Sequence, residues 1–172
     1  MKNVKDIVAK KTVEYYSEFV STKRDDILHT QEVVSYTRLI AAGEGMSEEE
    51  IAMQETAAWL HDIGCPCSRE RYGNSLPVNQ QNVGREVTNE LLKDVDLLTD
   101  EQRLWLADVV GTHHQYSKSL ELGFSPLFEA DLIVNLLSGY MSIDNAAQYY
   151  KTLMNTATGK SLFKTVVTDC VE

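Results

Sequence analysis

The stretch SEEEIAMQETAAWLHDIG, residues 47–64, contains a helix start, an apolar helix and an abrupt stop. Ser47 followed three residues later by Glu50 is a capping box, in which each side chain accepts a hydrogen bond from the other residue's backbone N–H. The apolar run that follows predicts a helix that reaches His61 and stops at Gly64. The end of this helix carries His61 and Asp62, two adjacent side chains that are costly to bury without partners.

The same helical spacing of apolar residues continues along the chain. Residues 64–78 hold two prolines and two glycines and are predicted to form a loop, as is the segment around Gly123. With no strand pair and no repeat in the pattern, the sequence predicts an all-α fold, a compact bundle of seven to eight helices in a single domain over residues 1–172. The other predicted helices cover residues 3–20, 26–42, 79–93, 99–113, 125–135, from 142 onward and about 160–170.

The composition and net charge limit which kinds of molecule the protein is expected to bind. The chain is 43% hydrophobic and 24% charged, as in soluble globular domains, and its net charge of −10 disfavours binding to duplex nucleic acid. Small phosphorylated molecules remain possible partners because local charge can override the mean field. No apolar run is long enough for a membrane span, and the beginning of the chain, MKNVKDIVAKK, lacks the apolar core of a signal peptide.

The cysteines indicate a reducing compartment. Three of them, Cys65, Cys67 and Cys170, make an odd count without a signal peptide, so a cytoplasmic location is expected. Cys65-Pro66-Cys67 does not have CxxC spacing, and ordinary loop residues are the expected reading, with a redox or metal role as the alternative.

All four histidines, and one unexpected aspartate, fall in or next to helices that must face the core. His29 lies inside ILHTQEVV, His113 and His114 end VVGTHHQY, and Asp131 interrupts PLFEADLIVNLL. Taken singly, His29 would be a hydrogen-bonded core histidine, and Asp131 a buried carboxylate that caps a neighbouring helix. Taken together with His61 and Asp62, they could all be satisfied by one shared metal ion.

The segments ILHTQEV, AAWLHDIG, VVGTHHQY and EADLIVN, in this order, resemble successive motifs of the HD-domain superfamily of metal-dependent phosphohydrolases. HDIGCPCSRERYG and FEADLIVNLL are most similar to a group of small single-domain bacterial members. The resemblance covers roughly residues 25–140 and implies an HD-domain-like bundle. It implies that the metal ligands are His29, His61, Asp62 and Asp131. Such imidazoles and carboxylates suit Mn²⁺, Fe²⁺, Co²⁺, Ni²⁺ or Zn²⁺, and suit Mg²⁺ less well.

The resemblance also suggests roles for residues around the ligands. In members with two metal ions, a histidine at the position of His113 or His114 holds the second ion, and such members also tend to have a histidine before the helix at 79–93. This chain has Asn79-Gln80-Gln81 there, so one ion rather than two is expected. His113 or His114 is then predicted to be catalytic, by contacting the scissile phosphate or protonating the leaving group. The alternative is a histidine pair stabilised by a helix dipole. The predicted substrate-binding residues are Arg71, Gln80 and Asn135, with a solvated arginine and packing amides as the alternatives.

The resemblance thus implies an enzyme that hydrolyses a phosphomonoester or phosphodiester, with a nucleotide or related small phosphorylated metabolite as substrate, by a metal-activated water. Alarmone hydrolases carry an acidic pair where this chain has Cys65 and Pro66, and HD-GYP enzymes carry a differently spaced signature from GFSP at 123–126, so neither subgroup fits. A metal-containing ligand-binding or regulatory module without catalysis is the main alternative, and a purely structural adaptor is the third. The oligomeric state, a homo-oligomer included, stays open.

Overall fold

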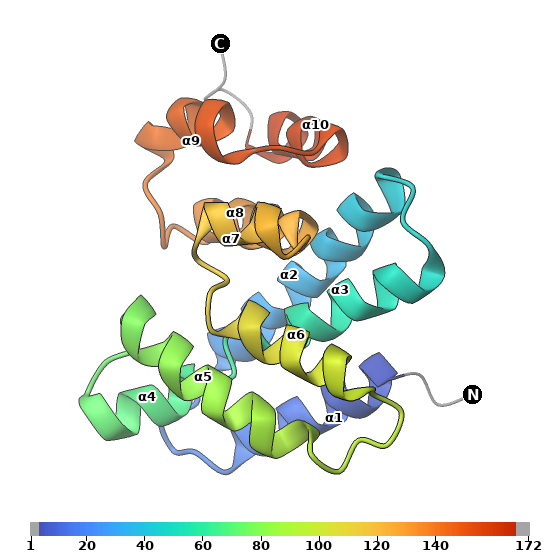
Figure 1. Cartoon of the computed structure of the whole chain (residues 1–172). Helices are drawn as coiled ribbons and strands as arrows, with labels where there is room; N and C mark the ends of the chain where they lie inside the picture. Colours follow the sequence, from blue (N-terminus) through green and yellow to red (C-terminus); the bar gives the residue numbers. More distant parts are fainter. Residues whose placement is uncertain (1–3, 168–172) are drawn as a thin grey trace.

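Three long helices form the centre of the molecule, which the computed structural model describes for residues 4–167. Helices α2 (Arg24–Gly43), α3 (Glu48–Leu60) and α8 (Ser125–Leu137) pack against one another (Figure 1). The predicted capping box at the start of α3 is confirmed, because Ser47 Oγ accepts from the Glu50 amide and Glu50 accepts from the Ser47 amide. Nearly every residue of α8 is buried, since it has neighbours on several sides.

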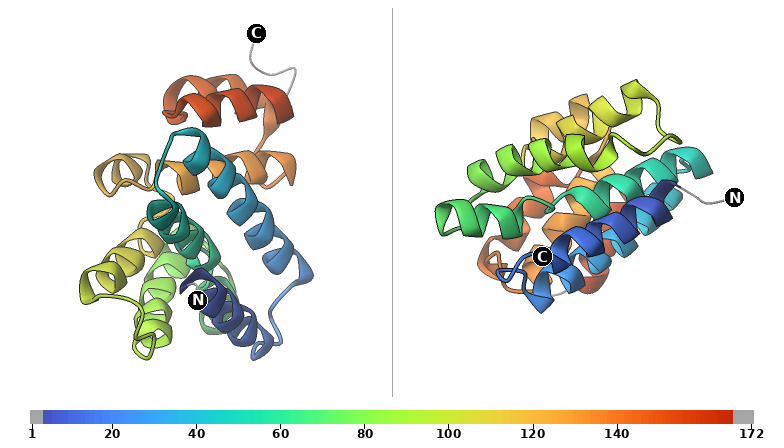
Figure 2. Two further views of the ribbon diagram at one scale, coloured as in Figure 1. Left: turned by 90° about the vertical axis from the view of Figure 1, so that its right-hand side faces the viewer. Right: turned by 90° about the horizontal axis from the view of Figure 1, so that it is seen from below.

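The other helices surround this centre on two sides. Helices α1 and α6 pack against α3, while α5 packs against α6 and α4. The last two helices lie on the far side of α8 from this group, as the views in Figures 1 and 2 agree. These elements are α1 (Val4–Ser17), α4 (Cys65–Tyr72), α5 (Pro77–Leu92), α6 (Asp100–Val110), α7 (Tyr116–Glu121), the 3-10 helix η1 (Ile143–Asn145), α9 (Ala146–Leu153) and α10 (Ala157–Val166). The all-α prediction is confirmed over residues 4–167.

Two segments predicted as loops contain short helices. Within residues 64–78 the chain forms α4, which begins at Cys65 and has Pro66 in its first turn. Proline is compatible with that position because the first backbone N–H groups of a helix have no partner within it. Gly73, with φ of 72°, then ends α4 in the left-handed conformation that glycine adopts without strain. The second short helix, α7, precedes Gly123.

Helix ends also differ from the predictions. Helix α6 starts after the predicted Thr99 cap but ends at Val110, so His113 and His114 lie in the turn beyond it. The segment from Ser142 onward opens with η1 before α9. The last helix spans residues 157–166 and starts at a Thr156 cap that the periodicity did not reveal. The end of the predicted 160–170 helix, with Cys170, lies outside the described residues.

One glycine contact positions the segment that follows α3. A Cβ atom on Gly64 would overlap the carbonyl oxygen of Gln80 and the backbone of Gly84, both in α5. The turn that carries His61 and Asp62 therefore lies with its backbone directly on α5. This approach brings Gln80 close to the two residues.

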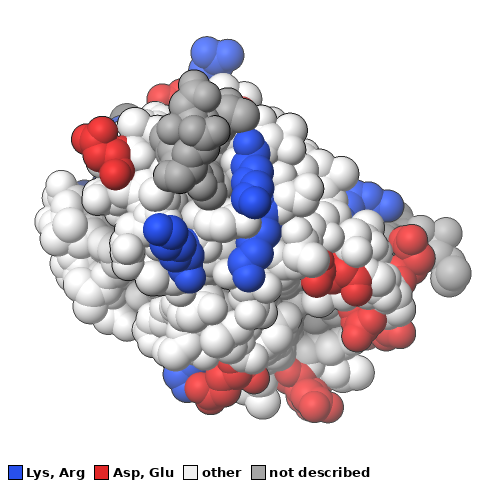
Figure 3. All heavy atoms as spheres, turned by 90° about the horizontal axis from the view of Figure 1, so that it is seen from above, with Lys and Arg blue, Asp and Glu red and all other residues white. Residues whose placement is uncertain are grey.

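The charges of the surface are unevenly distributed. Seen from the side of α9 and α10, the molecule has several lysine or arginine side chains near the middle of the face and carboxylates mainly toward its edge (Figure 3). The lysines of these two helices are Lys151, Lys160 and Lys164. Within residues 4–167 no helix has the length and apolarity needed to cross a membrane.

Candidate metal centre

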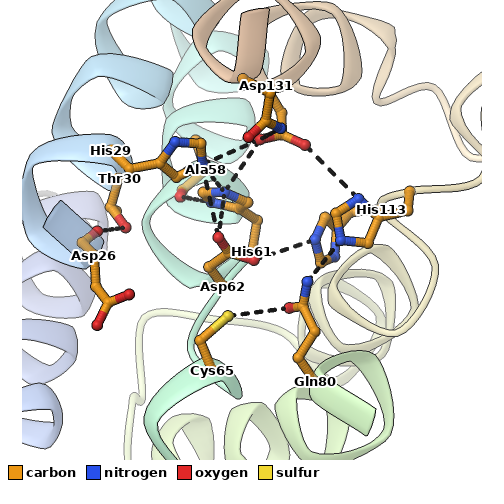
Figure 4. Close-up of polar contacts among 12 residues, drawn as sticks. Asp26, His29, Thr30, Ala58, His61, Asp62, Cys65, Gln80, His113 and Asp131 are labelled. Atoms are coloured by element: carbon orange, nitrogen blue, oxygen red, sulfur yellow. Dashed lines mark hydrogen bonds and ion pairs between the residues drawn. The ribbon is translucent and has the colours of Figure 1, made fainter. Parts of the chain in front are cut away.

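The structure brings together the four predicted metal ligands from three separate parts of the chain. His29 projects from α2, His61 and Asp62 follow the last turn of α3, and Asp131 projects from α8 (Figure 4). All three helices belong to the centre of the fold, so their packing fixes the relative positions of these side chains. His61 is fully buried, and Asp131 is 7% exposed.

The ligand atoms have the spacing expected of a shared ion. His29 Nε2 lies 3.2 Å from His61 Nε2 and 3.1 Å from Asp131 Oδ1. Asp62 Oδ2 lies 3.6 Å from His29 Nε2 and 3.5 Å from His61 Nε2, and His61 Nε2 lies 3.7 Å from Asp131 Oδ1. An ion with bonds of about 2.0–2.2 Å places neighbouring ligand atoms roughly 2.8–3.6 Å apart, between octahedral and tetrahedral angles. The residues present therefore fit a divalent metal ion.

Backbone carbonyls set the tautomer of two histidines. His61 Nδ1 lies 2.8 Å from the carbonyl oxygen of Ala58, and His113 Nδ1 lies 2.8 Å from that of Val110. Because a carbonyl oxygen only accepts hydrogen bonds, each Nδ1 carries a proton that it donates. In the neutral imidazole, Nε2 then carries a lone pair that is directed into the cluster. Metal-binding histidines are commonly oriented in this way, by a hydrogen bond from the other ring nitrogen.

Unsatisfied atoms around the cluster also indicate a ligand. Asp62 Oδ1 and His113 Nε2 are buried without a hydrogen-bond partner among the described residues. They lie 3.5 Å apart, and the His113 ring is 1% exposed. Because buried polar atoms normally have partners, each of these atoms needs an explanation. Asp62, His113 and His114 form a second group that could hold an ion, beside the group of His29, His61 and Asp131.

The carboxylates and imidazoles shift one another's pKa. Burial alone would lower the pKa of His29, but Asp131 and Asp62 outweigh it and raise that pKa above its ordinary value. Burial alone would raise the pKa of Asp131, but its contact with His29 and the nearby His61 lower it. The fully buried His61 keeps a lowered pKa, because desolvation is the largest influence on it. At neutral pH this set combines carboxylates with an imidazole held neutral, as metal binding requires.

His114 differs from His113 in its surroundings. Its Nε2 lies 2.6 Å from the Gln80 side-chain nitrogen, and Cys65 Sγ donates to the Gln80 oxygen at 3.5 Å. An amide nitrogen only donates, so His114 Nε2 accepts and Nδ1 carries the proton, 3.9 Å from Asp131 Oδ2. Burial, followed by the neighbouring His113, lowers the pKa of His114 to about 4, so this imidazole is neutral at pH 7.

A cavity of about 610 Å³ opens beside the cluster. His29, Asp62, Asp131 and His114 line it, but His113 does not. The rest of its wall includes Lys23, Arg69, Leu76, Gln80, Asn135, Tyr140 and Met141. The volume is in the range of small-molecule sites.

The predicted substrate-binding residues lie in different places. Gln80 and Asn135 line the cavity, where Asn135 Nδ2 donates to Asp131 Oδ1 at 2.8 Å. Arg71 instead lines a separate cavity between α1, α4 and α5, where it pairs with Glu86 at 3.1 Å. Of the other arginines, Arg69 reaches the cluster cavity but pairs there with Asp26.

Sequence reasoning did not single out two residues of the cavity wall. Lys23 precedes α2 by one residue, and no local pattern distinguishes it from other surface lysines. Tyr140 follows α8, and its ring meets the His29 ring edge-on with centroids 6.2 Å apart. Only the packing of the segment after α8 onto the start of α2 brings these residues to the site.

The comparisons leave the resemblance untested. No family model matches the chain, and neither the curated proteins nor the solved structures contain a match. The buried His/Asp groups could hold a metal ion on their geometry alone. Membership of the HD-domain superfamily stays a prediction.

Proposed function

We propose that this protein is a metal-dependent phosphohydrolase that cleaves a phosphomonoester or phosphodiester. One observation carries the proposal: His29 Nε2 and His61 Nε2 each lie within 3.7 Å of the other and of one oxygen of Asp62 and of Asp131, beside a solvent-connected cavity. A divalent ion bound there would polarise the phosphate and activate water at neutral pH. His29, His61, Asp62 and Asp131 would hold it.

The residues of the cavity wall supply the remaining requirements. Lys23 lines the cavity and would meet the negative charge of a phosphate, while Arg69 on the same wall is already paired with Asp26. His114, neutral and hydrogen-bonded to Gln80, offers its Nδ1–H to a phosphate or leaving-group oxygen. Its low pKa argues against a charged proton donor, so His114 would act as a hydrogen-bond donor in this scheme. Asn135 would orient Asp131.

The cavity also favours a substrate with a flat or apolar part. The Tyr140 ring is 65% exposed, and Leu76 and Met141 line the same wall. An aromatic ring of this kind can stack on a nucleobase. A nucleotide or related small phosphorylated metabolite is therefore the proposed substrate, and Mn²⁺, Fe²⁺, Co²⁺, Ni²⁺ or Zn²⁺ is the proposed ion.

The test combines metal analysis with a panel of phosphate esters. The purified protein is assayed for bound metal, and then with aryl phosphates, bis-aryl phosphates, nucleoside monophosphates and dinucleotides under each metal. The His61→Ala and Asp62→Ala variants should lose turnover and metal while circular dichroism shows the fold retained. Asp94→Ala, which removes an exposed carboxylate away from the cavity, serves as the matched control.

Three outcomes decide the proposal. Turnover that is lost in the two cluster variants and kept in the control supports the hydrolase. Bound metal without turnover on any ester class would instead favour a ligand-binding or regulatory module. Absence of both metal and turnover would contradict both functions and leave a structural role.

A further inference from the structure

A further cavity lies between the beginnings of α3 and α6. Its volume is about 430 Å³. Met46, Met53 and Trp105 give it apolar walls, and Gly123 lies at one side. The carboxylates of Glu49, Glu50 and Glu101 surround it, and its lining contains no lysine, arginine or histidine from the described part of the chain.

Gln54 adds a buried hydrogen-bonding group to this cavity. Its side chain belongs to the lining and is 5% exposed. Nε2 donates to the carbonyl oxygen of Gly123 at 2.8 Å, which fixes the orientation of the amide. The amide oxygen, Oε1, has no hydrogen-bond partner within residues 4–167. A buried acceptor of this kind is normally satisfied by a donor.

The rim carboxylates are available to a ligand to different degrees. Glu50 is already engaged in the capping box of α3. Glu49 and Glu101 are exposed residues of the first turns of α3 and α6, and no ion pair engages them within the described residues. These first-turn carboxylates already occupy the place where a helix N-terminus would attract an anion. An anionic ligand is therefore disfavoured at this cavity.

We infer that this cavity binds a small organic ammonium ion with an apolar body. The methionine and tryptophan side chains would cover the apolar body, and the face of an indole attracts a cation. Glu49 and Glu101 would pair with the positive charge, and an N–H group of the ligand would satisfy Gln54. The indole N–H is not needed for this, because it donates to the carbonyl of Leu122 at 2.8 Å.

The position of this cavity makes it independent of the proposed hydrolase site. It lies at the beginnings of α3 and α6, while His61 and His113 follow the ends of the same helices. None of its lining residues lines the cavity beside the metal cluster. Binding of the ammonium ion therefore does not rest on the proposed function.

The test uses three probes of similar length and different charge: 4-phenylbutylamine, 4-phenylbutanol and 4-phenylbutyrate. Calorimetry and amide chemical shifts report binding to the full chain. The amine should bind saturably, with shifts centred on Gln54, Trp105 and Gly123, and the alcohol and carboxylate at least about tenfold more weakly. The double substitution Glu49→Gln and Glu101→Gln should weaken amine binding by about tenfold.

The control is Glu18→Gln with Glu70→Gln, which removes the same charge from exposed positions outside this cavity. It should leave amine binding unchanged, and so should Asp131→Asn, which alters only the metal cluster. Equal binding of the carboxylate and the amine would overturn the proposal. An equal loss of affinity in the control pair would overturn it too, because it would show nonspecific attraction to an acidic protein. Binding of hexalysine in place of the amine would identify a peptide surface and overturn it as well.

Discussion

Glu129 and Asp131 lie two residues apart on α8, and both carboxylates are buried, yet their surroundings differ completely. Glu129 is 0% exposed, and its two oxygens accept hydrogen bonds from the amides of Asn155 and Thr156 and from the Thr156 hydroxyl. Asp131 faces instead a group of imidazole and carboxylate atoms whose lone pairs converge. The first carboxylate is matched by donors of the chain itself, while the second belongs to a set that a cation would complete.

This difference separates a structural acid, Glu129, from the proposed binding acid, Asp131. Glu129 joins α8 to the start of α10, because its oxygens accept from the amides of Asn155 and Thr156, the two residues that precede this helix. Asp131 shares its neighbourhood with Asp62 and His113, whose Oδ1 and Nε2 atoms have no hydrogen-bond partner among residues 4–167. Burial of a carboxylate alone therefore does not indicate a site. Neighbouring polar atoms that are buried without hydrogen-bond partners do indicate one.

The largest expected effect comes from removing the binding acid. Asp131→Asn keeps the shape of the side chain but removes the charge that completes the cluster, so metal affinity and any phosphatase activity should fall by about 10³-fold or more. Metal content by mass spectrometry and turnover under excess metal measure this loss. Without metal, the variant should unfold within a few degrees of the wild type. A metal content equal to that of the wild type would contradict the assignment of Asp131 as a ligand.

Removing the structural acid should lower the stability of the fold and leave metal binding unchanged. Glu129→Ala removes the acceptor of the Asn155 and Thr156 amides and the fully buried side chain itself, at a cost of about 3 kcal/mol. For a chain of this size that corresponds to a melting temperature lower by roughly 10 °C. Thermal unfolding in the presence of a chelator measures it, and metal bound per folded molecule should stay unchanged. Loss of metal at a temperature where the fold is intact would show that the two carboxylates are not separate.

Two glycines sharpen the comparison, one beside Glu129 and one in the turn that carries His61 and Asp62. A Cβ atom on Gly159 would overlap Glu129 Oε2, and one on Gly64 would overlap the Gln80 carbonyl oxygen. Both Gly159→Ala and Gly64→Ala should destabilise the fold by about 1–3 kcal/mol, since neither neighbour can move freely. Only Gly64→Ala should also weaken metal binding, because it displaces the turn that holds His61 and Asp62.

Gly111→Ala is the matched control for the two glycines. Gly111 follows α6 with an ordinary φ of −69°, and the nearest atom to its added Cβ would be 3.3 Å away. Its effect on both unfolding and metal binding should be small. If Gly159→Ala reduced metal binding as much as Gly64→Ala, the surroundings of Glu129 would not be independent of the metal cluster.

Local sequence patterns predicted what depends on local physics. The capping box at Ser47 and Glu50 and the cap at Thr99 are confirmed, because caps are formed by residues three apart in the chain. The loop predicted over 64–78 holds for residues 73–76 but was wrong for residues 65–72, because prolines and glycines were counted without regard to position. Pro66 lies in the first turn of α4 and Gly73 ends it, so both are compatible with a helix.

The site could be predicted only where residue type and context agreed. Four rare histidines in apolar helices, with Asp62 and Asp131, pointed to a cluster, and the structure brings them together. Arg71 was expected at the substrate because it follows His61 and Asp62 closely in sequence, but α4 carries it to a different cavity. Lys23 and Tyr140 lack any local signal, since they reach the site through the packing of α2 against the end of α8. Nor could the pattern reveal Glu129, whose role depends on a helix start 26 residues away.

The smallest expected effect is a pH dependence that belongs to the binding acid's neighbourhood alone. Burial alone would lower the pKa of His29 and of His113, but Asp131 and Asp62 respectively outweigh it and raise both above the ordinary value of about 6.5. A metal ion held by His29 must displace the proton of that imidazole, so its affinity should rise by up to about tenfold per pH unit between pH 6 and 8. In the metal-free protein the raised pKa values stabilise the fold below about pH 6.5, and this contribution is lost as the pH rises through the folded-state values.

The two curves of melting temperature against pH, with metal and with chelator, should therefore diverge from pH 6 to pH 8. Thermal unfolding at fixed metal concentration measures the divergence. Asp131→Asn should make it smaller at every pH, because this variant loses most of its metal affinity. Glu129→Ala should lower both curves together and leave their separation unchanged. A separation that stays constant with pH in the wild type would mean that metal binding displaces no proton. That result would contradict the assignment of His29 as a ligand.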